Sequence, residues 1–156
     1  FPVPMTPPLR LVLDTNTVLA LWMFHDPALK SLATLIASSG PMLHSRGDAL
    51  EELRRVLAYA QFGVAPEVQE TILGTYRARA TLAPPPPETA APLPLCRDRD
   101  DQKFLEIARD VSATHLLTRD KALLKLARHR LVRDRFQILP PERFVAAMQP
   151  DSAARQ

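Results

Sequence analysis

The fold is decided by the stretch Leu9-Arg-Leu-Val-Leu-Asp-Thr-Asn16. Its apolar residues form a short run typical of a parallel strand that is covered on both faces. The run stops at Asp14, and Thr15 or Asn16 can cap a following helix because both carry a side-chain oxygen. Open α/β sheets bind their ligands at the C-terminal ends of such strands. Asp14 is therefore either a site residue or a simple cap or turn residue.

Composition excludes several classes of protein. The chain has 156 residues, of which 46% are hydrophobic, and this is enough to bury a core. Its net charge of +3 permits nucleic-acid binding without requiring it. The single cysteine, Cys96, excludes an internal disulfide and a Cys-rich zinc site, and it fits a reducing compartment. We find no run near the ~20 apolar residues of a membrane helix and no signal segment, so we expect a cytoplasmic protein without a membrane partner.

The chain is expected to form one domain over residues 5–149. Met5 has the character of a natural start, so Phe1–Pro4 are expected to be a remnant of an expression vector, and residues 150–156 a flexible tail. Prolines cluster in residues 84–94. This segment is too short to separate domains, and it is typical of a stiff, extended surface connection.

Hydrophobic patterns alternate between strand-like and helix-like segments. The predicted strands are 9–13, 41–44, 114–118 and 136–139. The predicted helices are 16–24, 27–39, 45–59, 66–82, 100 or 101 to 111, 121–129 and 140–148. Strands separated by helices indicate an α/β fold with a parallel sheet and crossover helices.

Four acidic positions follow this pattern: Asp14, Glu52, Asp101 and Asp120. Asp14 and Asp120 come just after predicted strands, Glu52 lies in the helix after the second strand, and Asp101 begins the helix after the proline segment. Carboxylates gathered at one sheet edge repel one another unless a cation neutralises them. Oxygen ligands suit a hard divalent cation such as Mg²⁺ or Mn²⁺, so the set predicts a metal site.

Each acid also has a simpler interpretation. Glu52 fits a solvated helix face, and Glu51 competes for its role. Asp120 fits a plain helix cap. Three acids around the start of the helix after the proline segment compete for one position, and two of them can serve only to cap it: Asp98, Asp100 and Asp101.

Longer motifs resemble a known family. They are Leu-Val-Leu-Asp-Thr-Asn at 11–16, Glu-Leu-Arg-Arg-Val-Leu at 52–57, Cys96 to Ala108 with its Arg-Asp-Arg-Asp-Asp core, Leu-Thr-Arg-Asp-Lys-Ala-Leu-Leu at 117–124 and Leu-Pro-Pro-Glu-Arg-Phe at 139–144. In this order they resemble a PIN domain, and most closely the bacterial group of toxin components of toxin–antitoxin pairs that is related to the VapC toxins. The resemblance covers Leu9 to Met148 and implies a three-layer α/β/α sandwich around a parallel sheet.

The resemblance also implies an activity. It places Asp14, Glu52, Asp101 and Asp120 at a catalytic and metal-binding site for Mg²⁺ or Mn²⁺, and it implies endoribonuclease activity. The supporting residues that it implies are Asn16, Thr118 and Asp98. Asp98 is a further ligand or lies behind the ligands, and the sequence leaves open whether Asp98 or Asp100 shares the role of Asp101.

Cationic residues next to the proposed ligands are candidates for RNA binding. These are Arg54, Arg55, Arg119 and Lys121. Arg119 and Lys121 belong to a basic segment, 119–135, that an ordinary solvated surface also explains. If an antitoxin exists, Trp22–Phe24 are candidates for its binding surface or for a homodimer contact, although core packing explains them as well.

Three functions fit the sequence. The first is a metal-dependent endoribonuclease that acts as a toxin and is neutralised by an antitoxin protein. The second is a PIN-fold nuclease with another role in RNA processing or decay. The third is a catalytically inactive PIN-fold module that binds RNA or protein, and the complete set of four acids disfavours it.

Overall fold

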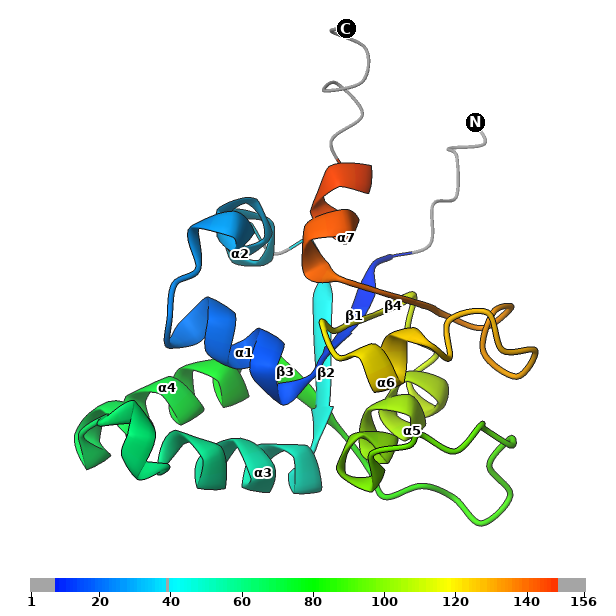
Figure 1. The fold of residues 1–156 in the computed structure, drawn as a ribbon, viewed down its shortest axis with the longest axis horizontal. Helices are drawn as coiled ribbons and strands as arrows, with labels where there is room; N and C mark the ends of the chain where they lie inside the picture. Colours follow the sequence, from blue (N-terminus) through cyan, green and yellow to red (C-terminus); the bar gives the residue numbers. More distant parts are fainter. Residues whose placement is uncertain (1–7, 39, 149–156) are drawn as a thin grey trace, which may run out of the picture.

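A five-stranded parallel sheet forms the centre of the protein (Figure 1). The computed structural model describes residues 8–38 and 40–148. The strands are β1 (Arg10–Leu13), β2 (Met42–Arg46), β3 (Ala80–Ala83), β4 (His115–Leu117) and β5 (Gln137–Leu139). They lie in the order β3-β2-β1-β4-β5, and every neighbouring pair is parallel. The predicted α/β fold with a parallel sheet is confirmed.

Helices cover both faces of the sheet and give three layers. The α-helices are α1 (Thr15–Trp22), α2 (Lys30–Ala37), α3 (Gly47–Leu57), α4 (Pro66–Arg79), α5 (Gln102–Asp110), α6 (Lys121–Leu124) and α7 (Pro141–Ala147), with short 3-10 turns η1 (Pro27–Leu29), η2 (Ala60–Phe62) and η3 (Arg99–Asp101). Side chains of β1 alternate between two cores, with Leu11 and Leu13 in one and Val12 in the other. In Figure 1, α1, α2 and α4 lie on one side of the strands, and α5 and α6 on the other.

The order of strands explains where a ligand can bind. From β1 the chain moves outward to β2 and β3, and it then crosses back to add β4 and β5 on the other side of β1. Such a reversal leaves a crevice outside the carboxyl ends of the two strands at which the order changes, here β1 and β4. Leu13 and Leu117 are register partners at these ends. Residues that directly follow them therefore face one another.

The prediction of a helix over 66–82 is wrong at its end. The helix α4 stops at Arg79, and Ala80 adopts extended backbone angles (φ −96°, ψ 145°). Residues 80–83 then form the edge strand β3, paired with β2 from Leu43 to Arg46. The Arg79 guanidinium donates to the carbonyls of Ile36 in α2 and of Pro41 just before β2. These hydrogen bonds hold the end of α4 against both segments. The sequence of residues 80–83 lacks the alternation of apolar and polar residues that is typical of a strand. Pairing with β2 therefore decides that this half-exposed segment is extended.

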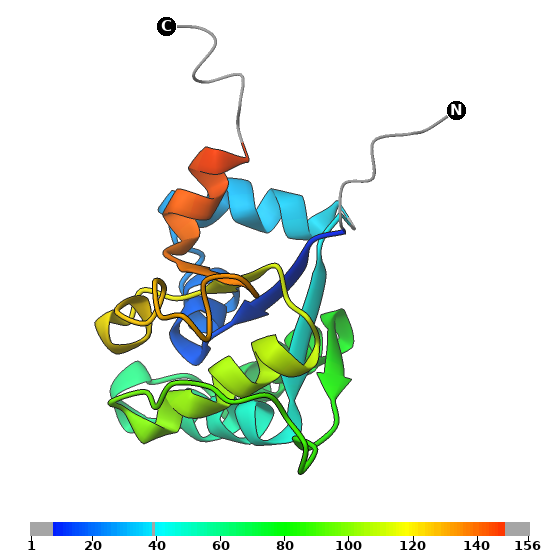
Figure 2. The same cartoon turned by 90° about the vertical axis from the view of Figure 1, so that its right-hand side faces the viewer.

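Two other boundaries also differ from the prediction. The strand β2 extends to Arg46, so α3 begins at Gly47 rather than at residue 45. The predicted helix over 121–129 is an α-helix only to Leu124, and hydrogen-bonded turns follow it. Segment 84–94 has no regular secondary structure, as predicted, and Arg109 and Gln102 donate to the carbonyls of Ala91 and Pro94. Figure 2 shows this segment running alongside α5.

Some expectations fall outside the described residues or stay predictions. Phe1–Pro4 and the tail at 150–156 are outside them, and the domain limits 5–149 stay a prediction. Trp22 and Met23 are half-buried and pack against the core, whereas Phe24 is 57% exposed. Among the described residues, no helix combines the length and the apolar character that a membrane crossing requires.

We predict that Leu105→Ala destabilises the protein by about 2–5 kcal/mol, because it opens a cavity beneath α5. Leu105 is fully buried in the core on the α5 face of the sheet. The matched control is Leu95→Ala, since Leu95 is 84% exposed and its loss removes little packing. Urea unfolding followed by circular dichroism measures both. Equal effects of the two substitutions would contradict the described core.

Candidate metal centre

The four predicted catalytic acids line one pocket of about 190 Å³ at the carboxyl ends of β1 and β4. Its lining residues are Asp14, Thr15, Asn16, Glu52, Val56, Asp98, Asp100, Asp101 and Asp120. They come from four separate parts of the chain, which are the start of α1, the middle of α3, the turn η3 and the residue before α6. The structure therefore brings together the four acids that the sequence singles out, together with Asn16 and Asp98.

Asp14 is both a helix cap and a pocket residue. It is only 3% exposed, one carboxylate oxygen accepts from the Thr17 backbone N–H (2.9 Å), and the other accepts from the Thr118 hydroxyl (2.5 Å). Burial raises the pKa of Asp14, and these hydrogen bonds oppose the rise. The two interpretations of Asp14 from the sequence are thus compatible.

Thr118 connects Asp14 to Asp120. Its side-chain oxygen donates to Asp14 and accepts from the Asp120 backbone N–H (3.0 Å). The Asp120 carboxylate caps α6 by accepting from the Ala122 N–H (3.0 Å). Thr118 is fully buried, so its hydroxyl is held in place by the packing around it. The Thr118 side chain therefore links the Asp14 carboxylate after β1 to the backbone of Asp120 after β4.

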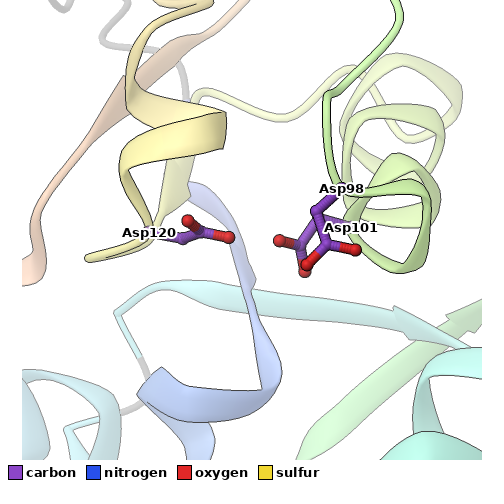
Figure 3. A group of neighbouring side chains, drawn as sticks. All are labelled: Asp98, Asp101 and Asp120. Carbon is purple, nitrogen blue, oxygen red and sulfur yellow. The ribbon is translucent and has the colours of Figure 1, made fainter.

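Three carboxylates face one another closely enough to share a cation (Figure 3). Asp98 and Asp101 lie side by side at η3, and Asp120 points toward them from the start of α6. One oxygen from each lies within 4.8 Å of the others. Asp98 thus belongs to the closest group of acids, and Asp100 lines the same pocket.

The ionisation of Asp101 reflects this crowding. Desolvation, a hydrogen bond with Asp120 and the negative charges of Asp120, Asp98 and Asp14 together raise the pKa of Asp101 to about 8. The same hydrogen bond is the main cause of a lowered pKa at Asp120. At neutral pH a proton on Asp101 therefore relieves part of the repulsion between the carboxylates. An all-oxygen set that gains from added positive charge fits a hard divalent cation such as Mg²⁺ or Mn²⁺.

Glu52 lies apart from this group of three. Its carboxylate accepts from the Thr15 hydroxyl (2.5 Å) and pairs with the Lys103 ammonium (3.3 Å). Glu51, its competitor in the sequence, is exposed, pairs with Arg54 and does not line the pocket. The sequence reading missed Thr15 and Lys103 as partners of Glu52. The sequence offers one signal for a role of Lys103 near the site, which is its position two residues after Asp101.

The predicted RNA-binding cations differ in their surroundings. Arg119 pairs with Asp26 (2.9 Å) and Glu142 (3.0 Å), and Arg54 pairs with Glu51. Arg55 and Lys121 are exposed. Within the described part of the chain, no ion pair involves either of these two side chains. They are the better placed of the four to meet a phosphate.

Comparison with known families agrees with this geometry. A family model for the PIN domain matches residues 10–122. The chain belongs to the PIN domain family. PIN domains are generally nucleases that use divalent metals, and the oxygen donors of this PIN domain suit such an ion. Searches of curated proteins and of solved structures give no match.

We predict that the metal-free protein loses stability as pH rises through about 8. Folded Asp101 binds a proton up to about pH 8, whereas its unfolded pKa is near 3.8. The folded state therefore holds more protons over this range, and its stability falls with pH. From pH 7 to 9.5 a folded pKa of about 8 gives a loss of about 1.4 kcal/mol, and we expect about 1 kcal/mol or less once the exposed part of the side chain is taken into account. Urea titrations in chelator measure it, and a slope that Asp101→Asn leaves unchanged would contradict the assignment.

We predict that Thr118→Val destabilises the protein by about 1–3 kcal/mol, because the buried Asp14 carboxylate loses a hydrogen-bond donor without a change in side-chain shape. Thr118→Ser keeps the hydroxyl and should lose less than half as much stability. Thermal unfolding of both variants provides the measurement. If valine and serine have the same effect, packing rather than the hydrogen bond explains the role of Thr118.

Proposed function

We propose that this PIN domain is a Mg²⁺- or Mn²⁺-dependent endoribonuclease that hydrolyses RNA phosphodiesters. The observation that carries the proposal is the convergence of Asp98, Asp101 and Asp120 within 4.8 Å, in a pocket also lined by Asp14 and Glu52. A PIN-fold module without activity has no need of such mutually repelling groups. The basic net charge of +3 and a pI near 9.4 agree with a nucleic-acid substrate.

Each acid has a proposed role. Asp101 and Asp120 would hold the cation, with Asp98 as a further ligand and Asp14 as a ligand placed by Thr118. A bound divalent cation polarises a phosphodiester and lowers the pKa of a water molecule. Glu52, fixed by Thr15, is placed to orient the attacking water. Asn16 is exposed at the pocket wall, where its amide can contact the substrate.

The RNA backbone would approach over the exposed cations near the pocket. Lys121 follows Asp120 directly, and Arg55 lies one helical turn from Glu52 on α3. Arg54 and Arg119 can join only by exchanging their carboxylate partners for phosphates, because both are paired. Arg55 and Lys121 therefore supply the main electrostatic attraction in this proposal.

We further propose that the enzyme is a cytoplasmic toxin that an antitoxin protein neutralises. The support is its resemblance to the toxin group of PIN domains. The exposed Phe24 and an apolar pocket of about 420 Å³ between α1, α2 and α4, lined in part by Trp22, offer apolar surface to an antitoxin or to a second copy in a homodimer.

The test is cleavage of a mixed-sequence RNA by the purified chain with Mg²⁺ or Mn²⁺ and after chelation. We expect cleavage only with the ion. Asp120→Asn and Glu52→Gln should lower the rate by about 100-fold or more, because they remove a ligand and a water-orienting group. The matched control is Glu51→Gln, one residue from Glu52 but outside the pocket, which should keep the wild-type rate. Cleavage that persists in Asp120→Asn would contradict the proposal.

The toxin role needs a separate measurement. Induced expression should arrest bacterial growth within a few generations, and the Asp120→Asn variant, expressed to the same level, should not. Wild-type nuclease activity in vitro without growth arrest would favour the second role, in RNA processing or decay.

A further inference from the structure

Lys103 is a cationic side chain held against Glu52, one of the residues that line the acidic pocket. Its ammonium lies 3.3 Å from a Glu52 carboxylate oxygen, and the two side chains are only 13% and 17% exposed. It also bonds to the backbone carbonyl of Asp100 and lies 5.1 Å from the centroid of the Phe104 ring. Three different groups therefore fix the ammonium, so it is placed there rather than free to extend into water.

The partner of Lys103 is fully engaged. One Glu52 oxygen accepts from Thr15, and the other faces Lys103. Glu52 is also outside the group of carboxylates whose oxygens are close enough to share one cation. That group consists of Asp98, Asp101 and Asp120. The pocket thus has two parts, one with three carboxylates facing one another and one in which the carboxylate already has a positive partner.

This division limits the number of ions that the pocket can bind. A divalent ion at Glu52 would have to displace the ammonium or accept a positive charge next to it. Repulsion between like charges at such distances is strong where water is partly excluded. The three aspartates carry no such penalty, because no ion pair with a basic side chain involves them within the described residues.

We propose that Lys103 is a positioning residue that neutralises Glu52 as an internal cation and so restricts the metal-binding pocket to one divalent ion, held by Asp98, Asp101 and Asp120 together with Asp14. This inference rests on the proposed metal-dependent function. It specifies that Glu52 acts without binding an ion of its own. It also assigns to Lys103 the charge that a second ion would otherwise supply.

The experiment counts Mn²⁺ bound per chain, by electron paramagnetic resonance of free Mn²⁺ during titration without RNA. We expect one ion for the wild type. Lys103→Met should bind a second ion, because the positive charge beside the Glu52 carboxylate has been removed. Lys103→Arg keeps the charge and should bind one ion. Lys30→Met removes a lysine that is exposed on α2, outside the pocket, and should match the wild type.

A role of Lys103 in packing alone would not change ion binding in this pattern. The double variant Lys103→Met with Glu52→Gln tests whether the second ion binds at Glu52. Because that ion needs the Glu52 carboxylate, the double variant should bind only one ion again. Circular dichroism checks that each variant is folded. If Lys103→Met does not fold, Lys103→Gln, which keeps a polar group near Glu52, takes its place with the same expectation.

The outcomes separate the two proposals. A wild-type chain that binds two ions, or a folded Lys103→Met that still binds only one ion, overturns the role of Lys103 and leaves the nuclease proposal standing. A wild-type chain that binds no Mn²⁺ at millimolar concentrations contradicts the metal-dependent nuclease itself.

Discussion

Repulsion between carboxylates at the carboxyl ends of β1 and β4 is the constraint on which the site depends. The sheet places Asp14 and Asp120 there because the strand order reverses between these two strands. The turn η3 and the residue before it add Asp101 and Asp98 from the segment that leads into α5. Gathering acids in this way costs free energy of folding unless the charges are compensated, and the surrounding structure supplies a different compensation for three of the acids.

Three kinds of compensation are present. Asp14 is stabilised by hydrogen bonds from Thr118 and Thr17, Asp101 by a proton that it keeps to about pH 8, and Glu52 by the Lys103 ammonium. If a cation binds as proposed, the proton on Asp101 is the compensation that it would replace, while the hydrogen bonds and the ion pair keep their partners in place.

The charged residues around the pocket divide between structural and binding roles. Arg119 joins the turn before η1 to α7 through Asp26 and Glu142, so it stabilises the contact between distant segments. Arg46 does the same for β2 and α5 through Glu106. Arg55 and Lys121 have no such partner among the described residues and remain available to a phosphate backbone. A basic residue next to a pocket acid in the sequence is thus not by itself available to a substrate.

The sequence alone determined the α/β class, the parallel sheet and the acids that gather at one edge, because strand periodicity and the residue after each strand are local properties. It did not reveal β3, whose extended backbone depends on pairing with β2. It could not decide between Asp98, Asp100 and Asp101, and the tertiary structure places Asp98 and Asp101 opposite Asp120. Nor could it find the Lys103–Glu52 pair, because these residues lie on different helices and meet only when α3 and α5 pack together.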